Sequence, residues 1–224
     1  MIVGGRMGMP IRVYDPQDDC SIVERRLPHW SQAYTMCFIT WRTWDSMPAE
    51  VVARWQKERA DDLRNNGIAP TKDWRQSLYQ RGDDFAERLL TRFSDRWHEH
   101  LDNCHGRCVL ARPELARIVE EGLLHFDRDR YELTDFVIMP NHVHLLVSFP
   151  DRSAMLAQCE SWKQHSARQL NRELKRSGRF WQQDAFDHLV RSSDQFAYLR
   201  KYIADNSTKA RLPPGRFIHY SRPM

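Results

Sequence analysis

His142 and His144 are separated by one residue, and this spacing is the strongest chemical signal in the chain. They follow Pro140-Asn141, and apolar residues flank that pair on both sides. Proline fixes φ and asparagine tolerates turn geometry, so the segment predicts two strands that meet at a turn. Residues i and i+2 of a strand point to the same face. Both imidazoles therefore project together, while Val143 points into the core.

Two imidazoles on one strand face are the beginning of a metal site. They leave positions for a carboxylate, an amide, water or a substrate phosphate. The alternative is a polar strand face with two solvated histidines, because the His-x-His pattern is short and common. An apolar hairpin around the pair and a basic, tyrosine-bearing segment downstream favour the metal interpretation.

The last predicted helix, from Gln195 to about Asn206, has Tyr198, Tyr202 and Asn206 at i, i+4 and i+8, so the three share one face. A tyrosine hydroxyl is a poor nucleophile at its unperturbed pKa of ~10. It becomes useful when it attacks a phosphorus from which a metal has drawn charge. The amide of Asn206 is a candidate third ligand beside the two histidines. The alternative role for each tyrosine is half-buried packing.

Length and composition indicate a globular protein outside the membrane. At 224 residues, one domain is the default expectation, and two small domains are the alternative. No apolar run approaches the ~20 residues of a membrane span, and the first residues lack an apolar signal core. The five cysteines are odd in number and scattered, which predicts reduced thiols and a cytoplasmic setting. The spacing of Cys104 and Cys108 is wrong for a usual zinc knuckle, so a structural zinc there is disfavoured.

Positive charge is concentrated near the end of the chain. The net charge is +4, but residues 160–224 hold 13 Lys/Arg and 6 Asp/Glu, while the remainder is net −3. This asymmetry is typical of a surface that meets a phosphate backbone, although a solvated basic helix would look the same. Four basic side chains on a predicted helix from Asp151 to about Arg176 are candidate DNA-binding residues: Lys163, Arg168, Arg172 and Lys175. Two aromatic residues follow that helix, Phe180 and Trp181, and are also candidates. They would either stack on unpaired bases or belong to the core.

The predicted elements alternate as strand, helical stretch, strand, strand, helix, strand and helix. This order predicts an α+β fold with a ferredoxin-like β-α-β-β-α-β sheet and an added C-terminal helix that bears the tyrosines. We expect an irregular N-terminal arm over residues 1–30, a single domain over 31–212 with a helical elaboration over about 48–127 in its first crossover, and a C-terminal tail over 213–224. The strands are predicted at residues 33–41, 131–139, 142–149 and 185–191, with a further short strand at 108–110.

His142-Val143-His144 after Met139-Pro140-Asn141 resembles the histidine motif of HUH-type single-strand DNA transposases with one catalytic tyrosine. The nearest resemblance is to the REP-associated tyrosine transposase group, and it spans about residues 33–212. Further matching segments occur in the same order: Phe38-Ile39-Thr40-Trp41-Arg42, Asp45-Ser46-Met47-Pro48, Gly106-Arg107-Cys108, Ser161-Trp162-Lys163, Gly178-Arg179-Phe180-Trp181-Gln182, Phe186-Asp187, Arg191 and Tyr202-Ile203-Ala204-Asp205-Asn206.

The resemblance implies roles for these residues. His142 and His144 would bind a divalent metal, Mg²⁺ or Mn²⁺, and Asn206 would be the third ligand. Tyr202 would be the nucleophile, because it is the tyrosine followed by Ile and then by Asn at i+4, and Tyr198 is its rival. The partner would be single-stranded, hairpin or palindromic DNA, joined through a 5′-phosphotyrosine, and the protein would act as a monomer or homodimer.

The family usually continues its Tyr-Ile-x-x-Asn segment with proline, whereas this chain has Ser207. Without that proline the helix is free to continue beyond Asn206. One alternative function follows, that of a hairpin-binding protein with impaired cleavage. A second alternative is a His-x-His metallohydrolase for small phosphoesters. It is disfavoured because no further Asp/His set follows His144 within the strand.

Overall fold

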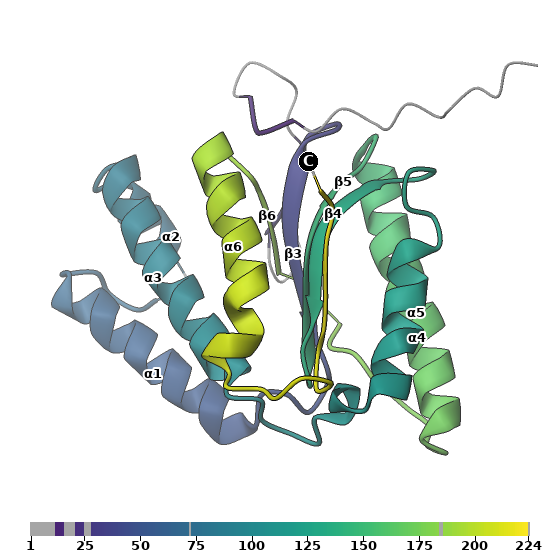
Figure 1. Ribbon diagram of the computed structural model, residues 1–224. Helices are drawn as coiled ribbons and strands as arrows, with labels where there is room; N and C mark the ends of the chain where they lie inside the picture. Colours follow the sequence, from purple (N-terminus) through teal and green to yellow (C-terminus); the bar gives the residue numbers. More distant parts are fainter. Residues whose placement is uncertain (1–11, 16–20, 25–27, 72, 184–185, 224) are drawn as a thin grey trace, which may run out of the picture. The chain divides into compact units, whose positions relative to one another are not determined.

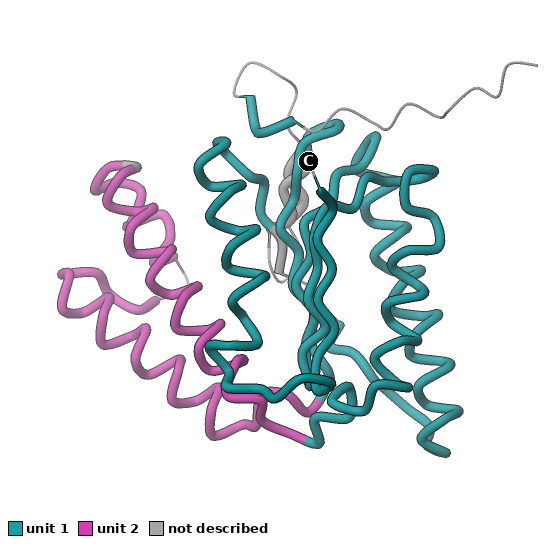
Figure 2. The backbone as a smooth tube through the Cα atoms, in the orientation of Figure 1, with its two compact units in different colours: residues 1–44, 107–224 teal, residues 45–106 magenta. Residues whose placement is uncertain are grey.

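The computed structural model describes residues 12–15, 21–24, 28–71, 73–183 and 186–223. It separates into two compact units, coloured in Figure 2: unit 1 comprises residues 1–44 and 107–224, and unit 2 comprises residues 45–106. The sequence predicted one domain with a helical elaboration over about 48–127. The structure ends the elaboration at residue 106 and keeps α4 (Pro113–Leu124) in unit 1.

Unit 1 is built on a five-stranded sheet in which every pair of neighbours is antiparallel. The predicted α+β class is therefore confirmed. Along the chain, β3 (Met36–Arg42), β4 (Glu132–Ile138) and β5 (His142–Ser148) precede α5 (Arg152–Glu173), β6 (Phe186–Leu189) and α6 (Ser193–Lys209), as predicted. In spatial order the strands are β6 (Phe186–Leu189), β3 (Met36–Arg42), β5 (His142–Ser148), β4 (Glu132–Ile138) and β7 (Ile218–Ser221).

The sheet separates two apolar cores, because alternate residues of its buried strands point to opposite faces. On one face, Ile39 and Val143 belong to a core that includes residues of α4 and α5 (Arg152–Glu173). On the other face, Phe38 and Leu146 belong to a core that includes residues of α6 (Ser193–Lys209). Figure 1 shows α4 and α5 on one side of this sheet and α6 on the other.

The helices that flank the sheet begin at side-chain caps. The Asp151 side chain accepts a hydrogen bond from Ala154 N, and Ser192 Oγ accepts one from Gln195 N. α5 ends at Glu173, three residues before the predicted end. α6 continues to Lys209, three residues beyond its predicted end, because no proline stops it after Asn206.

The structure corrects three predictions of irregular or strand structure. The expected tail contains β7, whose Tyr220 ring stacks on Phe136 of β4 with centroids 5.1 Å apart. The expected irregular arm contains an antiparallel pair, β1 (Ser21–Glu24) and β2 (Pro28–Ser31), while residues 1–11, 16–20 and 25–27 lie outside the described part. The expected strand at 108–110 is instead a 3₁₀ turn, Val109–Ala111.

Unit 2 is helical and comprises α1 (Ala49–Asn65), α2 (Trp74–Tyr79) and α3 (Asp83–Asp102). Gly82 interrupts the helical run, since it has φ +105° at the start of α3. Gly106 is required by a close approach, because a Cβ there would lie 2.4 Å from the Asp45 carbonyl oxygen. Among the described residues, no helix has the length and apolar character to cross a membrane.

Candidate active site

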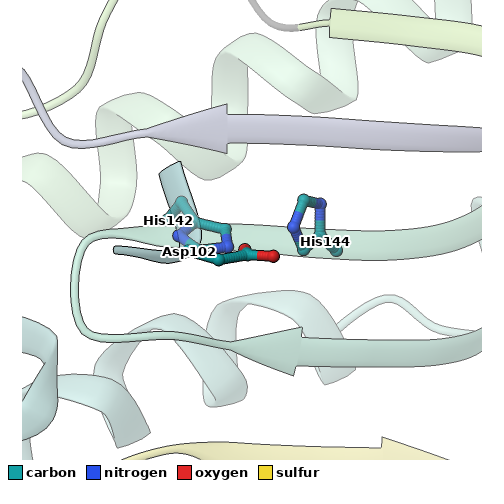
Figure 3. Close-up of side chains that lie close together, drawn as sticks. All are labelled: Asp102, His142 and His144. Atoms are coloured by element: carbon teal, nitrogen blue, oxygen red, sulfur yellow. The ribbon is translucent and has the colours of Figure 1, made fainter. Parts of the chain in front are cut away.

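His142 and His144 are the first and third residues of β5, and both are buried. Their ring centroids lie 4.6 Å apart with an angle of 73° between the planes. Figure 3 shows both imidazoles on the same side of the strand, as the two-residue period predicts. Asp102, also labelled there, belongs to α3 of unit 2, whereas the two histidines belong to unit 1.

Each imidazole is held through its Nδ1 atom. His142 Nδ1 lies 2.7 Å from Asn141 Oδ1, and His144 Nδ1 lies 2.7 Å from Thr40 Oγ1 on the paired strand. An amide oxygen only accepts hydrogen bonds, so Nδ1 of His142 carries the proton and donates. In the neutral ring, Nε2 then keeps its lone pair, the form in which histidine binds metals. When Thr40 Oγ1 accepts a hydrogen bond from Nδ1 of His144, Nε2 of that ring likewise keeps its lone pair.

Tyr202 of α6 packs against the histidine face of the sheet. Its ring meets His144 edge to face, with centroids 5.4 Å apart, and meets Phe38 in the same manner at 5.9 Å. Phe38 also stacks on His144 at 5.3 Å, so one β3 side chain contacts both candidate site residues. Tyr198, one turn earlier, is 59% exposed. The structure therefore brings Tyr202 into ring contact with His144, whereas more than half of the Tyr198 side chain is exposed.

Two further α6 residues lie near Tyr202. Asn206, one helical turn later, is fully buried. The ammonium of Lys209 lies 4.6 Å from the centroid of the Tyr202 ring, so the helical extension past Asn206 adds a positive charge beside the tyrosine. Sequence reasoning did not identify Lys209, although its i+7 spacing from Tyr202 was a usable signal.

The donor set suits a divalent metal ion. Two imidazoles are oriented through Nδ1, and a buried amide lies on the helix that covers the same face of the sheet. Imidazole nitrogen and amide oxygen are both ordinary ligands of divalent cations in proteins. Thus His142 and His144, with Asn206 as the proposed third ligand, fit such an ion.

α6 is fixed to the sheet by an arginine that the sequence did not single out. Arg200 Nε donates to both carboxylate oxygens of Asp135 on β4, at 2.9 and 3.1 Å. Its Nη2 donates to Ser221 Oγ of β7 and to the carbonyl oxygen of Arg222, both at 2.8 Å. Because Tyr202 lies two residues after Arg200, this network sets the position of the tyrosine over the sheet.

A third histidine lies near the site. His188 of β6 is opposite Phe38 of β3 in the sheet register, and the two ring centroids are 5.5 Å apart. Burial lowers the pKa of His188 to about 4, so the ring is neutral at physiological pH. Phe38 thus contacts both the half-buried, neutral His188 and the candidate metal ligand His144.

The two candidate stacking residues belong to the core. Phe180 is 3% exposed and Trp181 is 4% exposed, and both join the cluster that includes residues of α4 and α5. Trp181 Nε1 donates to Ser166 Oγ at 2.9 Å. Neither ring is available to a nucleic-acid base, so the core alternative holds and the stacking alternative is wrong for both. Aromatic residue type alone could not distinguish the two roles.

The four candidate basic residues lie on or just after α5, on the opposite side of the sheet from α6 (Figure 1). Arg168, Arg172 and Lys175 are exposed, while Lys163 donates through Nζ to the carbonyl oxygen of Gln183 at 2.5 Å. The structure therefore does not gather these charges with the histidines and Tyr202. Their contact with DNA stays a prediction.

Comparison with known proteins finds a family similarity over part of the chain. Residues 112–206 match the model of the family "Transposase IS200 like". No curated protein matches the chain. A solved structure of a REP-associated tyrosine transposase bound to a REP hairpin is 13% identical, with a TM-score of 0.40, and the match covers 80% of this chain and 69% of that one. Over residues 112–206, which include both histidines, Tyr202 and Asn206, the chain is similar to the IS200-like transposases, and the transposase resemblance recognised in its sequence is confirmed there.

Proposed function

We propose that this protein is a metal-dependent strand transferase that cleaves and joins single-stranded DNA at hairpins or palindromes. The observation that supports this most directly is the edge-to-face contact of Tyr202 with His144, at 5.4 Å between centroids. It combines a hydroxyl nucleophile with a pair of imidazoles whose Nδ1 atoms are already engaged. The match of residues 112–206 to IS200-like transposases supports DNA as the substrate class.

In the proposed step, Tyr202 Oη attacks the scissile phosphorus in line with the departing 3′ oxygen. The new bond joins Oη to phosphorus, and the bond from phosphorus to the 3′ oxygen breaks. The phenol loses its proton and the departing oxygen gains one, so the products are a 5′-phosphotyrosine and a free 3′-hydroxyl. The reverse attack by another 3′-hydroxyl releases Tyr202 and joins the new end, so no nucleotide cofactor is required.

The roles of the surrounding residues follow from their contacts. His142 and His144 would hold a divalent ion, Mg²⁺ or Mn²⁺, with Asn206 as the third ligand, and such an ion would draw charge from the phosphate. Asn141 and Thr40 keep the imidazoles in their orientations. The positive charge of Lys209 beside the Tyr202 ring suits a site that handles a phenolate and a phosphate.

A denaturing gel tests this proposal. End-labelled hairpin DNA from the palindromes that flank the protein's own gene is incubated with the protein and Mn²⁺, and a covalent protein–DNA band is sought. We expect the band with wild type and with Tyr198→Phe, and its loss with Tyr202→Phe and His142→Ala. Tyr198→Phe is the matched control, because it removes a hydroxyl one turn away on the same helix.

Binding of the same hairpin in EDTA shows whether each variant remains folded and able to recognise DNA. Loss of the band only in Tyr198→Phe would transfer the nucleophile to that residue. If neither wild type nor any variant forms a band although wild type binds the hairpin, the protein is a hairpin-binding module. The extension of α6 beyond Asn206 is the feature that would then set it apart from active relatives.

A further inference from the structure

We propose that Trp44, backed by Arg179, is a stacking platform for an unpaired base of single-stranded DNA. This inference relies on the proposed function for the class of ligand, and it gives that function a contact to bases. The sequence resemblance did not single out Trp44, and the two aromatic residues first considered for stacking are buried. Trp44 differs from them because it is 49% exposed.

Trp44 is held in place through its backbone. Its N–H donates to the carbonyl oxygen of Phe180 at 2.8 Å, and its carbonyl oxygen accepts from Gln182 Nε2 at 3.1 Å. The preceding residue, Thr43, forms an antiparallel bridge with Trp181. The segment after α5 is thereby paired with the end of β3. An exposed indole on such a fixed backbone loses little conformational entropy when a ligand binds.

One face of the indole is already covered by a cation. The guanidinium carbon of Arg179 lies 4.5 Å from the centroid of the Trp44 ring. Arg176 Nη2 donates to the carbonyl oxygen of Arg179 at 2.8 Å, which fixes the backbone of the loop beneath that contact. A base stacked on the exposed part of the ring would bring a phosphate near these guanidinium groups. The combination of aromatic surface and positive charge is the usual recognition mode for single strands.

Trp44 lies at the histidine end of the sheet. Arg42 is opposite His142 in the β3–β5 register, and Thr43 N donates to the carbonyl oxygen of Asn141 at 2.8 Å. Trp44 is the next residue along this path. A strand whose phosphate reaches the histidine pair therefore passes the end of β3, where the exposed indole can take a neighbouring base.

The test measures base stacking separately from phosphate contact. Fluorescein-labelled dT12 is titrated with protein in EDTA and followed by fluorescence anisotropy, beside a 12-unit abasic oligomer that keeps the phosphates and lacks the bases. Stacking of a base on an aromatic ring contributes to affinity for single strands, so Trp44→Ala should weaken dT12 binding by roughly tenfold. We expect it to leave binding of the abasic oligomer within about twofold of wild type, while Arg179→Ala weakens both through the lost charge.

Two further variants make the result specific. Trp44→Phe retains an aromatic face and should bind dT12 within about threefold of wild type. Tyr79→Ala removes another exposed aromatic side chain, in unit 2, and should bind like wild type. The inference is overturned if wild type does not bind dT12, if Trp44→Ala binds it normally, or if Trp44→Ala loses the same factor with the abasic oligomer.

The covalent-band assay distinguishes failure of this inference from failure of the proposed function. Stacking by Trp44 without any Tyr202-dependent band would retain the platform and remove the catalytic proposal. A Tyr202-dependent band together with normal dT12 binding by Trp44→Ala would retain the catalytic proposal and remove the stacking platform.

Discussion

Asn141 Oδ1 lies 2.7 Å from Nδ1 of the adjacent His142, and this contact determines which nitrogen of the ring carries the proton. The turn residue thereby leaves Nε2 with the lone pair that a metal requires. Thr40 is the corresponding partner of His144 on the neighbouring strand, at 2.7 Å. The turn and β3 thus orient the two imidazoles before any ligand arrives.

Asn141→Ala should weaken Mn²⁺ binding to the protein alone by about tenfold or more, because His142 loses the acceptor that fixes its tautomer. Calorimetric titration without DNA measures this directly, so the result does not depend on catalysis. Asn141→Asp should restore tight binding, since a carboxylate oxygen also accepts from Nδ1. Equal Mn²⁺ affinity for Asn141→Ala and wild type would contradict the positioning role.

Arg200→Ala should lower the free energy of unfolding by about 3 kcal/mol, because Asp135 is 1% exposed and would lose its charged partner. Urea denaturation measures the change. Lys201→Ala is the matched control at the next position of α6, since its partner Asp205 and its own side chain are exposed. An exposed pair of this kind contributes less than about 1 kcal/mol. Similar losses for the two variants would exclude a special role for the Arg200 network.

His188 predicts a loss of stability on mild acidification. Burial lowers its pKa to about 4 in the folded protein, against about 6.5 when unfolded. Between these values the unfolded chain binds more protons, so stability falls as the pH decreases through that window. From pH 7 to pH 5 the loss from this one residue is at most about 2 kcal/mol.

His188→Gln is the comparison that isolates this contribution, because it keeps a polar side chain of similar length without a charge at pH 5. Urea midpoints are measured for both proteins at pH 7 and pH 5. Wild type should lose more stability than the variant over this interval. An equal loss in the two proteins would mean that His188 remains easy to protonate in the folded state.

The sequence predicted the central part of the site because local periodicity determines it. The i, i+2 spacing placed His142 and His144 on one strand face, and the i, i+4 spacing placed Tyr202 and Asn206 on one helix face. The α+β class and the order of strands and helices followed from the same periodicities. These features depend on neighbours within the chain, which the sequence contains explicitly.

Features that depend on distant partners could not be predicted. Phe180 and Trp181 are buried because α5 and the end of β3 enclose them, and no local pattern distinguishes such a pair from an exposed one. β7 has four residues, and it is a strand because β4 offers it an edge and Tyr220 stacks on Phe136. Trp44 was missed because its exposure is likewise set by tertiary structure.

Ser207 tests how far the family pattern applies to this chain. The family usually has proline after the asparagine of its tyrosine helix, so Ser207→Pro would restore the pattern. Here, however, Ser207 lies inside α6, which continues to Lys209. Proline would remove an intrahelical hydrogen bond and clash with the preceding turn, at a cost of about 3 kcal/mol. It would also displace Lys209 from the Tyr202 ring.

We therefore expect Ser207→Pro to lower the urea midpoint and, under the proposed function, to reduce the yield of the covalent band. Thr208→Ala, at the adjacent exposed position, should change neither quantity appreciably. A stable Ser207→Pro variant with a stronger band would contradict both expectations. The helical extension would then be an adaptation that restrains Tyr202, and the family proline would be compatible with the rest of this fold.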